Sequence, residues 1–256
     1  MKRLICIICV LGFTSISNAK QPTQEHIERW QNLSENLTYY DLYVIMDEMQ
    51  DFSLRSWPEP LRQILLKMAT TFKQMTKDYA AGKPIIIPDK FAPRKVDDGK
   101  CDGEITDVLI EAIVRQKDPR FLFFFKDWGL GGWPGDGLAG IGEPAFETII
   151  EGLNRKNSAS APYQATRALG LILQEENNFL QTNLQKREIA KRALINLAQN
   201  HGRPGQFGAV STLRFFPSTD VITVLETISL TDPYKSGDQF PLRVRAQESL
   251  EYLRTH

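Results

Sequence analysis

The chain has 256 residues, of which 42% are hydrophobic, 10% aromatic and 24% charged. This is the composition of an ordinary globular protein of one or two domains. Lys+Arg and Asp+Glu both count 31, so there is no excess of positive charge for binding a phosphate backbone, and we expect no nucleic-acid partner.

The first predicted element is a leader. Lys2 and Arg3 precede a short apolar run over residues 4–13, and small residues at Ser17 and Ala19 come before Lys20. This is the pattern of a cleavable secretory signal, and the run is about half of the roughly 20 residues that cross a bilayer. We therefore predict a signal peptide over 1–19, export to the periplasm or the medium, and no integral membrane span after cleavage.

Cysteine usage limits the redox chemistry of the predicted mature chain. Cys6 and Cys9 lie in the leader, which leaves Cys101 as its single cysteine and excludes an intramolecular disulfide. No histidine is near Cys101 in the sequence to activate it, so a buried or half-exposed thiol is favoured over a nucleophile. Whether this thiol is reactive stays open.

Residues 20–82 are predicted to form an N-terminal helical region that caps the rest of the fold. Apolar residues recur at three- and four-residue steps over 24–38, 41–50 and 60–79, which indicates three amphipathic helices. Thr23 is the expected N-cap of the first helix, and Gly82 is expected to end the third. The proline-punctuated segment 83–102 then predicts a linker or long loop.

Residues 103–256 are predicted to form a domain of short helices joined by turns rich in Pro, Gly and Asp. Helix-like periodicity with no strand-like alternation favours an all-α class. Small residues recur at comparable points of several helices, as Ala165, Ala209 and Ala246 do, and small residues let neighbouring helices approach closely. The expected helices cover 104–116, 120–127, 140–153, 163–173, 184–199, 207–216, 219–230 and 241–255.

Two runs carry a family resemblance. The run GLAGIGEPAFETII over 137–150 resembles the A-x-x-L-G-x-I-G-D-P-A-x-x-x-L-I consensus of HEAT-like repeats, including the subgroup first described in phycobilin lyases. The run VRAQESLEYL over 244–253 is similar to the V-R-x-x-A-x-x-A-L helix of that family, with the alanine shifted. The resemblance covers about 103–256 and does not extend to the first 100 residues.

This resemblance implies an α-solenoid of degenerate helix pairs that binds another protein. It implies no catalytic residue, no cofactor and no lyase activity. The expected function is therefore a non-catalytic protein-binding scaffold. The departure from the family pattern is a Gly/Trp insertion over 128–137, which replaces the start of a regular helix.

That Gly/Trp segment is the predicted distinctive contact of the scaffold. Trp128 and Trp133 offer flat apolar faces, five glycines let the backbone turn or approach a ligand, and Asp127 and Asp136 add carboxylates. A peptide or a sugar is the ligand that such a segment suits. The structural alternative is that the indoles pack on the neighbouring phenylalanines of 121–125 and the glycines only turn the chain.

The competing function is an enzyme that acts on an envelope glycan. Its proton donor would be one of Asp127, Asp136 and Glu143, and it would require two carboxylates to converge in a cleft within about 5–10 Å. The three histidines have no ligand-spaced partner, so we expect no metal site. The basic stretch over 186–192 is interleaved with Glu188 and is interpreted as a solvated helix face.

Overall fold

The computed structural model of the protein describes residues 21–49, 52, 57–83, 104–126, 133–200, 202 and 204–256. Within these ranges the regular elements are all helices, apart from isolated bridge positions such as the pair Ser236 and Gln239. The predicted all-α class is confirmed. The predicted leader 1–19, Cys101 and the predicted linker beyond Lys83 lie outside the described residues.

The N-terminal part consists of three helices, as predicted. Thr23 caps the first, with its hydroxyl oxygen accepting the His26 N–H at 3.4 Å. Gly82 follows the third at φ +72°, and the next N–H, of Lys83, donates to the Asp78 carbonyl at 2.9 Å. This is the positive-φ helix end for which glycine is suited. The helices are α1 (Gln24–Glu35), α2 (Tyr39–Met49) and α3 (Glu59–Ala80).

The rest of the described chain continues as short helices and two 3-10 turns. Most bounds agree with the sequence prediction to within three residues. The elements are α4 (Glu104–Arg115), η2 (Pro119–Phe121), α5 (Leu122–Phe125), α6 (Trp133–Ile141), η3 (Glu143–Ala145), α7 (Phe146–Asn154), α8 (Ser160–Gln174), α9 (Phe179–Thr182), α10 (Leu184–Gln199), α11 (Gln206–Leu213), α12 (Thr219–Thr231) and α13 (Pro241–Thr255).

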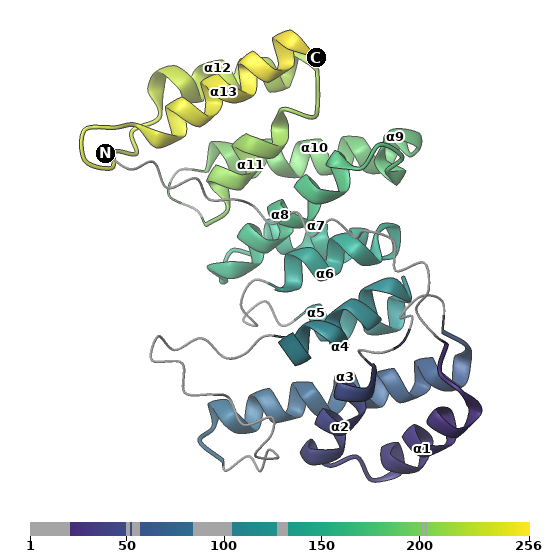
Figure 1. Cartoon of the computed structure of the whole chain (residues 1–256). Coiled ribbons are helices and arrows are strands. Elements are labelled where there is room, and N and C mark those ends of the chain that lie inside the picture. The colour runs from purple at the N-terminus through teal and green to yellow at the C-terminus, as the bar shows by residue number, and fades with distance from the viewer. Residues whose placement is uncertain are drawn as a thin grey trace, which may run out of the picture.

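From α4 onward the helices lie in two layers. Layer one consists of α4, α6, α8, α11 and α13, and each of these contacts the next. Layer two consists of α7, α10 and α12, which also contact in succession. The pairs α7 with α8, α10 with α11 and α12 with α13 join the layers. Figure 1 shows this order, from α1–α3 at the lower end to α12 and α13 at the upper end.

One hydrophobic core follows this succession. It extends without interruption from Trp30 in α1 to Leu250 in α13. The small residues predicted to lie between neighbouring helices are fully buried, with Ala165, Ala209 and Ala246 each 0% exposed. Each helix pair therefore depends on its neighbours to cover its apolar side.

Glycine is required in α6 by close packing rather than by backbone conformation. A Cβ added at Gly137 would lie 2.1 Å from Cε1 of Phe125, and one added at Gly140 would lie 2.0 Å from Cγ1 of Val114. Both distances are far inside van der Waals contact. The two glycines thus let α6 lie directly against α4 and α5.

The start of α6 corrects one sequence prediction. The segment 128–137 was expected to replace the beginning of a helix, yet α6 begins at Trp133 and contains 133–137. Glycine costs about 1 kcal/mol relative to alanine in a helix interior, and the close contacts of α6 with its neighbours offset that cost. Two smaller differences are the short α9, which was not predicted, and the end of α5 at Phe125 instead of residue 127.

Arg120 joins the N-terminal helices to this succession. Its guanidinium donates to Glu59 Oε1 at the start of α3 at 2.6 Å and to Asp118 Oδ2 at 2.6 Å. Arg120 holds the pKa of Glu59 down to about 2 and also lowers the pKa of Asp118. The three charges fix the beginning of α3 beside the turn that precedes α5.

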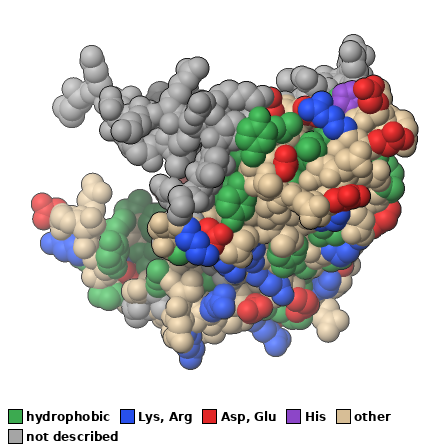
Figure 2. All heavy atoms as spheres, turned by 90° about the horizontal axis from the view of Figure 1, so that it is seen from below, with side chains coloured by type: hydrophobic (Ala, Val, Ile, Leu, Met, Phe, Trp, Pro, Cys, Tyr) green, Lys and Arg blue, Asp and Glu red, His purple; other side chains and the backbone are tan. Residues whose placement is uncertain are grey.

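Charges are mixed on the surface of the N-terminal end. Figure 2 views the molecule from the end that carries α1–α3, and acidic and basic side chains are interspersed over that face. A surface that binds a phosphate backbone concentrates positive charge instead. The visible face therefore agrees with the balanced charge of the whole sequence.

Candidate functional site

The Gly/Trp segment is described only in part. Asp127 and Trp128 lie outside the described residues. Trp133 is the first residue of α6, but its side chain also lies outside them. Asp136 is the one predicted site residue of this segment whose side chain is placed. The proposed contact role of the two tryptophans therefore stays a prediction.

Asp136 is held by an arginine of the next layer-one helix. Arg167 Nε lies 3.1 and 3.0 Å from the two carboxylate oxygens, and Nη2 lies 2.9 Å from Oδ1. Hydrogen bonding to Asp136 raises the pKa of Arg167. The pair joins α6 to α8 at a half-exposed position, which is a structural use of both side chains.

Glu143 is also held by a cation. Lys186 Nζ lies 3.0 Å from Glu143 Oε1, so the ion pair joins η3 to α10. Asp127, the third candidate proton donor, lies outside the described residues. A glycosidase requires two carboxylates that face each other across a cleft, whereas Asp136 and Glu143 are each paired with a cation. Their placement gives the enzymatic alternative no support.

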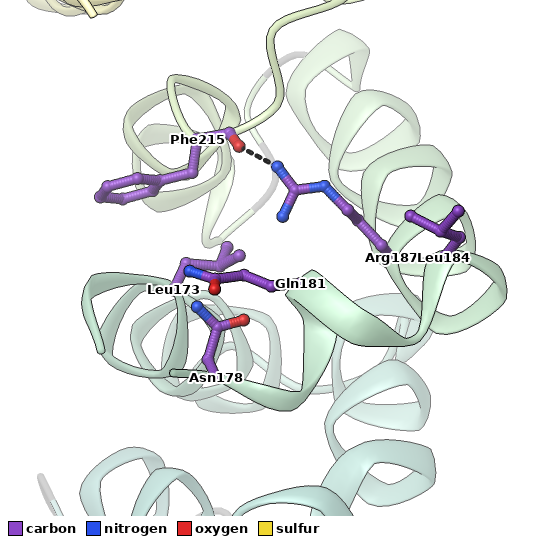
Figure 3. A pocket seen from close by; sticks show the side chains of 6 residues that line it. All are labelled: Leu173, Asn178, Gln181, Leu184, Arg187 and Phe215. Atoms are coloured by element: carbon purple, nitrogen blue, oxygen red, sulfur yellow. Dashed lines mark hydrogen bonds between the residues drawn. The ribbon is translucent and has the colours of Figure 1, made fainter. Parts of the chain in front are cut away.

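A pocket opens where α8 ends, α9 and α10 meet, and α11 ends. It has a volume of about 350 Å³, within the range of small-ligand sites. Figure 3 shows side chains from these elements converging on it. We call it the α10 edge pocket, and its lining residues are Leu173, Asn178, Gln181, Leu184, Arg187 and Phe215.

Local capping positions the polar residues of this pocket. The Asn183 side chain accepts the Lys186 N–H at 3.0 Å and so begins α10. One turn later α10 presents Arg187 to the pocket. Opposite it, Asn178 precedes α9 and donates from Nδ2 to the Glu175 carbonyl at 2.8 Å. Asn178 is 4% exposed, and its Oδ1 has no hydrogen-bond partner among the described residues.

Arg187 is the cation of the pocket, and no carboxylate of the described chain pairs with it. Its Nη2 donates to the Phe215 carbonyl at 2.6 Å, and its guanidinium carbon lies 4.8 Å from the centre of the Phe216 ring. Burial without an anion lowers the pKa of Arg187 below its usual value. The guanidinium is thus partly removed from water and has only neutral partners.

A second hollow of about 280 Å³ continues from the pocket along α10. It shares Leu184 and Arg187 with the pocket and also contacts the turn between α11 and α12. Its two other charged residues are engaged, because Lys191 Nζ lies 3.0 Å from Glu188 and 2.8 Å from Asp220. Arg187 is therefore the cation that both hollows offer to a ligand.

The interpretation of the basic stretch 186–192 as a solvated face was wrong for most of its members. Arg192 fits it, with its side chain 77% exposed. Lys186 and Lys191 are 27% and 14% exposed in their ion pairs, and Arg187 lines the pocket. Periodicity placed these residues on a helix but could not identify their neighbours, which are η3, α7 and α9 for Lys186, the ends of α8 and α11 for Arg187, and α12 for Lys191.

A stripe of exposed apolar side chains crosses layer one. Tyr163, Phe207 and Val244 lie near the starts of α8, α11 and α13 and are 54%, 43% and 50% exposed. Each stands two residues before a fully buried alanine, so the three positions are equivalent on their helices. The guanidinium of Arg245 lies 4.8 Å from the centre of the Phe207 ring, which shows that α11 and α13 meet at this stripe. We call these three residues the layer-one stripe.

Among the described side chains, no cluster of three or more His, Cys, Asp or Glu residues is placed to hold a metal ion. No helix in the described ranges combines the length and the apolar character that a bilayer crossing requires. Compared with protein-family models, with curated proteins and with solved structures, the chain gives no match in any of the three.

Proposed function

We propose that the protein is an exported, HEAT-like α-solenoid that serves as a non-catalytic scaffold for a protein partner. The observation that carries this proposal is the two-layer succession of helices, in which each helix of layer one contacts the next. Such a row has an extended outer surface and no enclosed centre. Its surfaces are suited to contact with another macromolecule.

The repeat assignment has two independent supports. The runs over 137–150 and 244–253 resemble HEAT-like repeats, and they form parts of α6, α7 and α13. Equivalent alanines in α8, α11 and α13 are fully buried, and these three helices contact in succession. On this proposal α1–α3 are the N-terminal cap, because α2 and α3 pack against α4.

The layer-one stripe is the proposed contact surface of the scaffold. Aromatic side chains are enriched in protein interfaces, and Tyr163 and Phe207 stand at equivalent places on neighbouring helices. Trp128 and Trp133 would extend the contact beyond α8, since Trp133 begins the preceding layer-one helix. Export is supported by the leader pattern over 1–19 and places the partner in the periplasm or the medium.

Partner capture tests this function. We expect a Tyr163→Asp/Phe207→Asp double variant to capture about one tenth or less of the partner that the wild type captures. The reason is that two charges would be buried at the interface. Both changes place an acid in the first turns of helices, where it is favoured, so the melting temperature should stay within a few degrees. The measurement is quantitative mass spectrometry of proteins cross-linked to the immobilised chain in the envelope fraction of its source.

Tyr40→Asp is the matched control, since Tyr40 is 50% exposed but lies in α2. It should retain the partner as the wild type does. Equal retention by the double variant, or no protein enriched by the wild type over an empty matrix, would contradict the proposal.

A further inference from the structure

We infer that the α10 edge pocket binds the C-terminal residue of a protein partner, with the carboxylate on Arg187 and an aliphatic side chain against Leu173, Leu184 and Phe215. This inference rests on the proposed scaffold function and names the chemical group that the scaffold recognises. The pocket lies where α8 and α11 end, whereas the layer-one stripe lies near the starts of α8, α11 and α13.

The charge of the pocket selects an anion. Arg187 donates from Nη2 to a neutral carbonyl and stacks on an aromatic ring, which leaves Nε and Nη1 for a ligand. Charge-assisted hydrogen bonds from arginine to a carboxylate are among the strongest in proteins, and the planar guanidinium matches the two carboxylate oxygens. A carboxylate would supply the counter-charge that no described residue provides.

The buried amide opposite Arg187 selects a hydrogen-bond donor. Asn178 Oδ1 is an acceptor with no partner in the described chain. In Figure 3 the Asn178 and Gln181 side chains lie together on the side of the pocket opposite Arg187. Gln181 is exposed, so its side chain can move aside and let a peptide N–H reach Oδ1. A C-terminal residue carries both groups, because its carboxylate and its N–H are attached to the same Cα.

The apolar lining selects the side chain. Leu184 is 73% exposed although it lies beside the pocket. Leu173 and Phe215 line the same hollow. An aliphatic C-terminal side chain such as leucine or valine would cover this surface. The neighbouring hollow of about 280 Å³ gives room for the residues that precede it.

A carboxylate fits better than a phosphate. Of the cations near the pocket, Lys186 is paired with Glu143 and Lys191 with Glu188 and Asp220. Among the residues that line the two hollows, Arg187 is the cation without a carboxylate partner, while Arg214 lies outside the lining and stacks on the Phe215 ring at 4.9 Å. One guanidinium balances one negative charge but not the nearly two charges of a phosphate group. Glu188, which borders the second hollow, would repel the higher charge more strongly.

Short peptides test the inference directly. Acetyl-Ala-Ala-Leu and acetyl-Ala-Ala-Val, each as free acid and as C-terminal amide, are titrated into the ¹⁵N-labelled purified protein and followed by amide chemical shifts. We expect at least one free acid to bind tenfold or more tightly than its amide, with shifts centred on 173–187 and 215. Arg187→Gln should remove this preference.

Two further variants keep the test independent of folding. Leu184→Glu puts a negative charge at the rim of the pocket without disturbing the exposed start of α10. It should weaken the binding of the free-acid peptide at least tenfold. Arg192→Gln changes an exposed arginine of the same helix and should leave binding unchanged. No preference for acid over amide with either peptide, an unchanged Leu184→Glu variant, or equal displacement by inorganic phosphate would overturn the inference.

The outcome also separates this inference from the proposed function. If the peptides show no preference for the free acid while the Tyr163→Asp/Phe207→Asp variant still loses its partner, the pocket assignment fails and the scaffold stands. If the free acids bind as expected but no partner is captured, the scaffold proposal fails instead.

Discussion

Ending the chain at Asp232, and so removing α13, is expected to make most of the expressed protein insoluble. α13 packs on both α11 and α12 and buries Leu242, Ala246 and Leu250. Each fully buried aliphatic side chain contributes about 1.5–3 kcal/mol, and the apolar surface it covered becomes a large exposed patch. The measurement is the soluble fraction after expression, with the melting curve of any soluble material.

A shorter deletion is the matched control. Removing Arg254–His256 takes away three exposed residues and should leave solubility and melting temperature as in the wild type. A soluble, monomeric protein that ends at Asp232 and melts cooperatively at the wild-type temperature would mean that α13 covers nothing essential.

The Gly140→Ala variant is expected to have a free energy of unfolding about 1–3 kcal/mol lower than the wild type, because its new methyl group overlaps Val114. The Cβ would lie 2.0 Å from Cγ1 of Val114. The overlap outweighs the gain of about 1 kcal/mol that alanine brings to a helix. Adding Val114→Ala removes Cγ1 of Val114, the atom that the new methyl group overlaps. The double variant should therefore be more stable than the sum of the two single effects predicts. Chemical denaturation gives the four free energies of unfolding.

Gly170→Ala provides the control in the neighbouring helix. Its Cβ would meet only Thr212 Oγ1, at an ordinary distance of 3.5 Å, so the change should be neutral or stabilising by up to about 1 kcal/mol. A Gly140→Ala protein as stable as the wild type would mean that α4 and α6 do not approach as described.

The helices were predictable because their apolar residues recur locally. In α2, helical spacing alone indicates which face is buried, even when the helices that pack on it are not known. The residues at that spacing are all fully buried, and they are Leu42, Ile45, Met46 and Met49. The same holds for Ala165, Ala209 and Ala246, whose small size indicated close neighbours. Local signals such as the Thr23 cap and the Gly82 helix end were likewise readable from the sequence.

The start of α6 was not predictable from the same signals. Glycine indicates a turn when only the local chain is considered. The reason for Gly137 and Gly140 lies in Phe125 and Val114, and the relative position of these side chains is set by the packing of α6 on α4 and α5. A contact between residues that are distant in the sequence produces no periodic pattern in the sequence.

The α10 edge pocket was missed for a related reason. Leu173 and Phe215 are far apart in the sequence and meet only because α8 and α11 end at the same edge. The one available signal was the combination of Asn183, a helix cap, with Arg187 one turn later. That pattern also occurs on many solvated helices, so it could not identify a pocket.

The central claim is that helix pairs cover one another in a row, and hydrogen exchange of the Leu250→Ala variant tests it most directly. Leu250 is 6% exposed in α13, and its truncation costs about 2–5 kcal/mol. In a row, this loss should speed amide exchange in α11–α13 and leave α1–α4 at wild-type rates. Equal acceleration in every helix, from α1 to α13, would contradict the row and the scaffold function drawn from it.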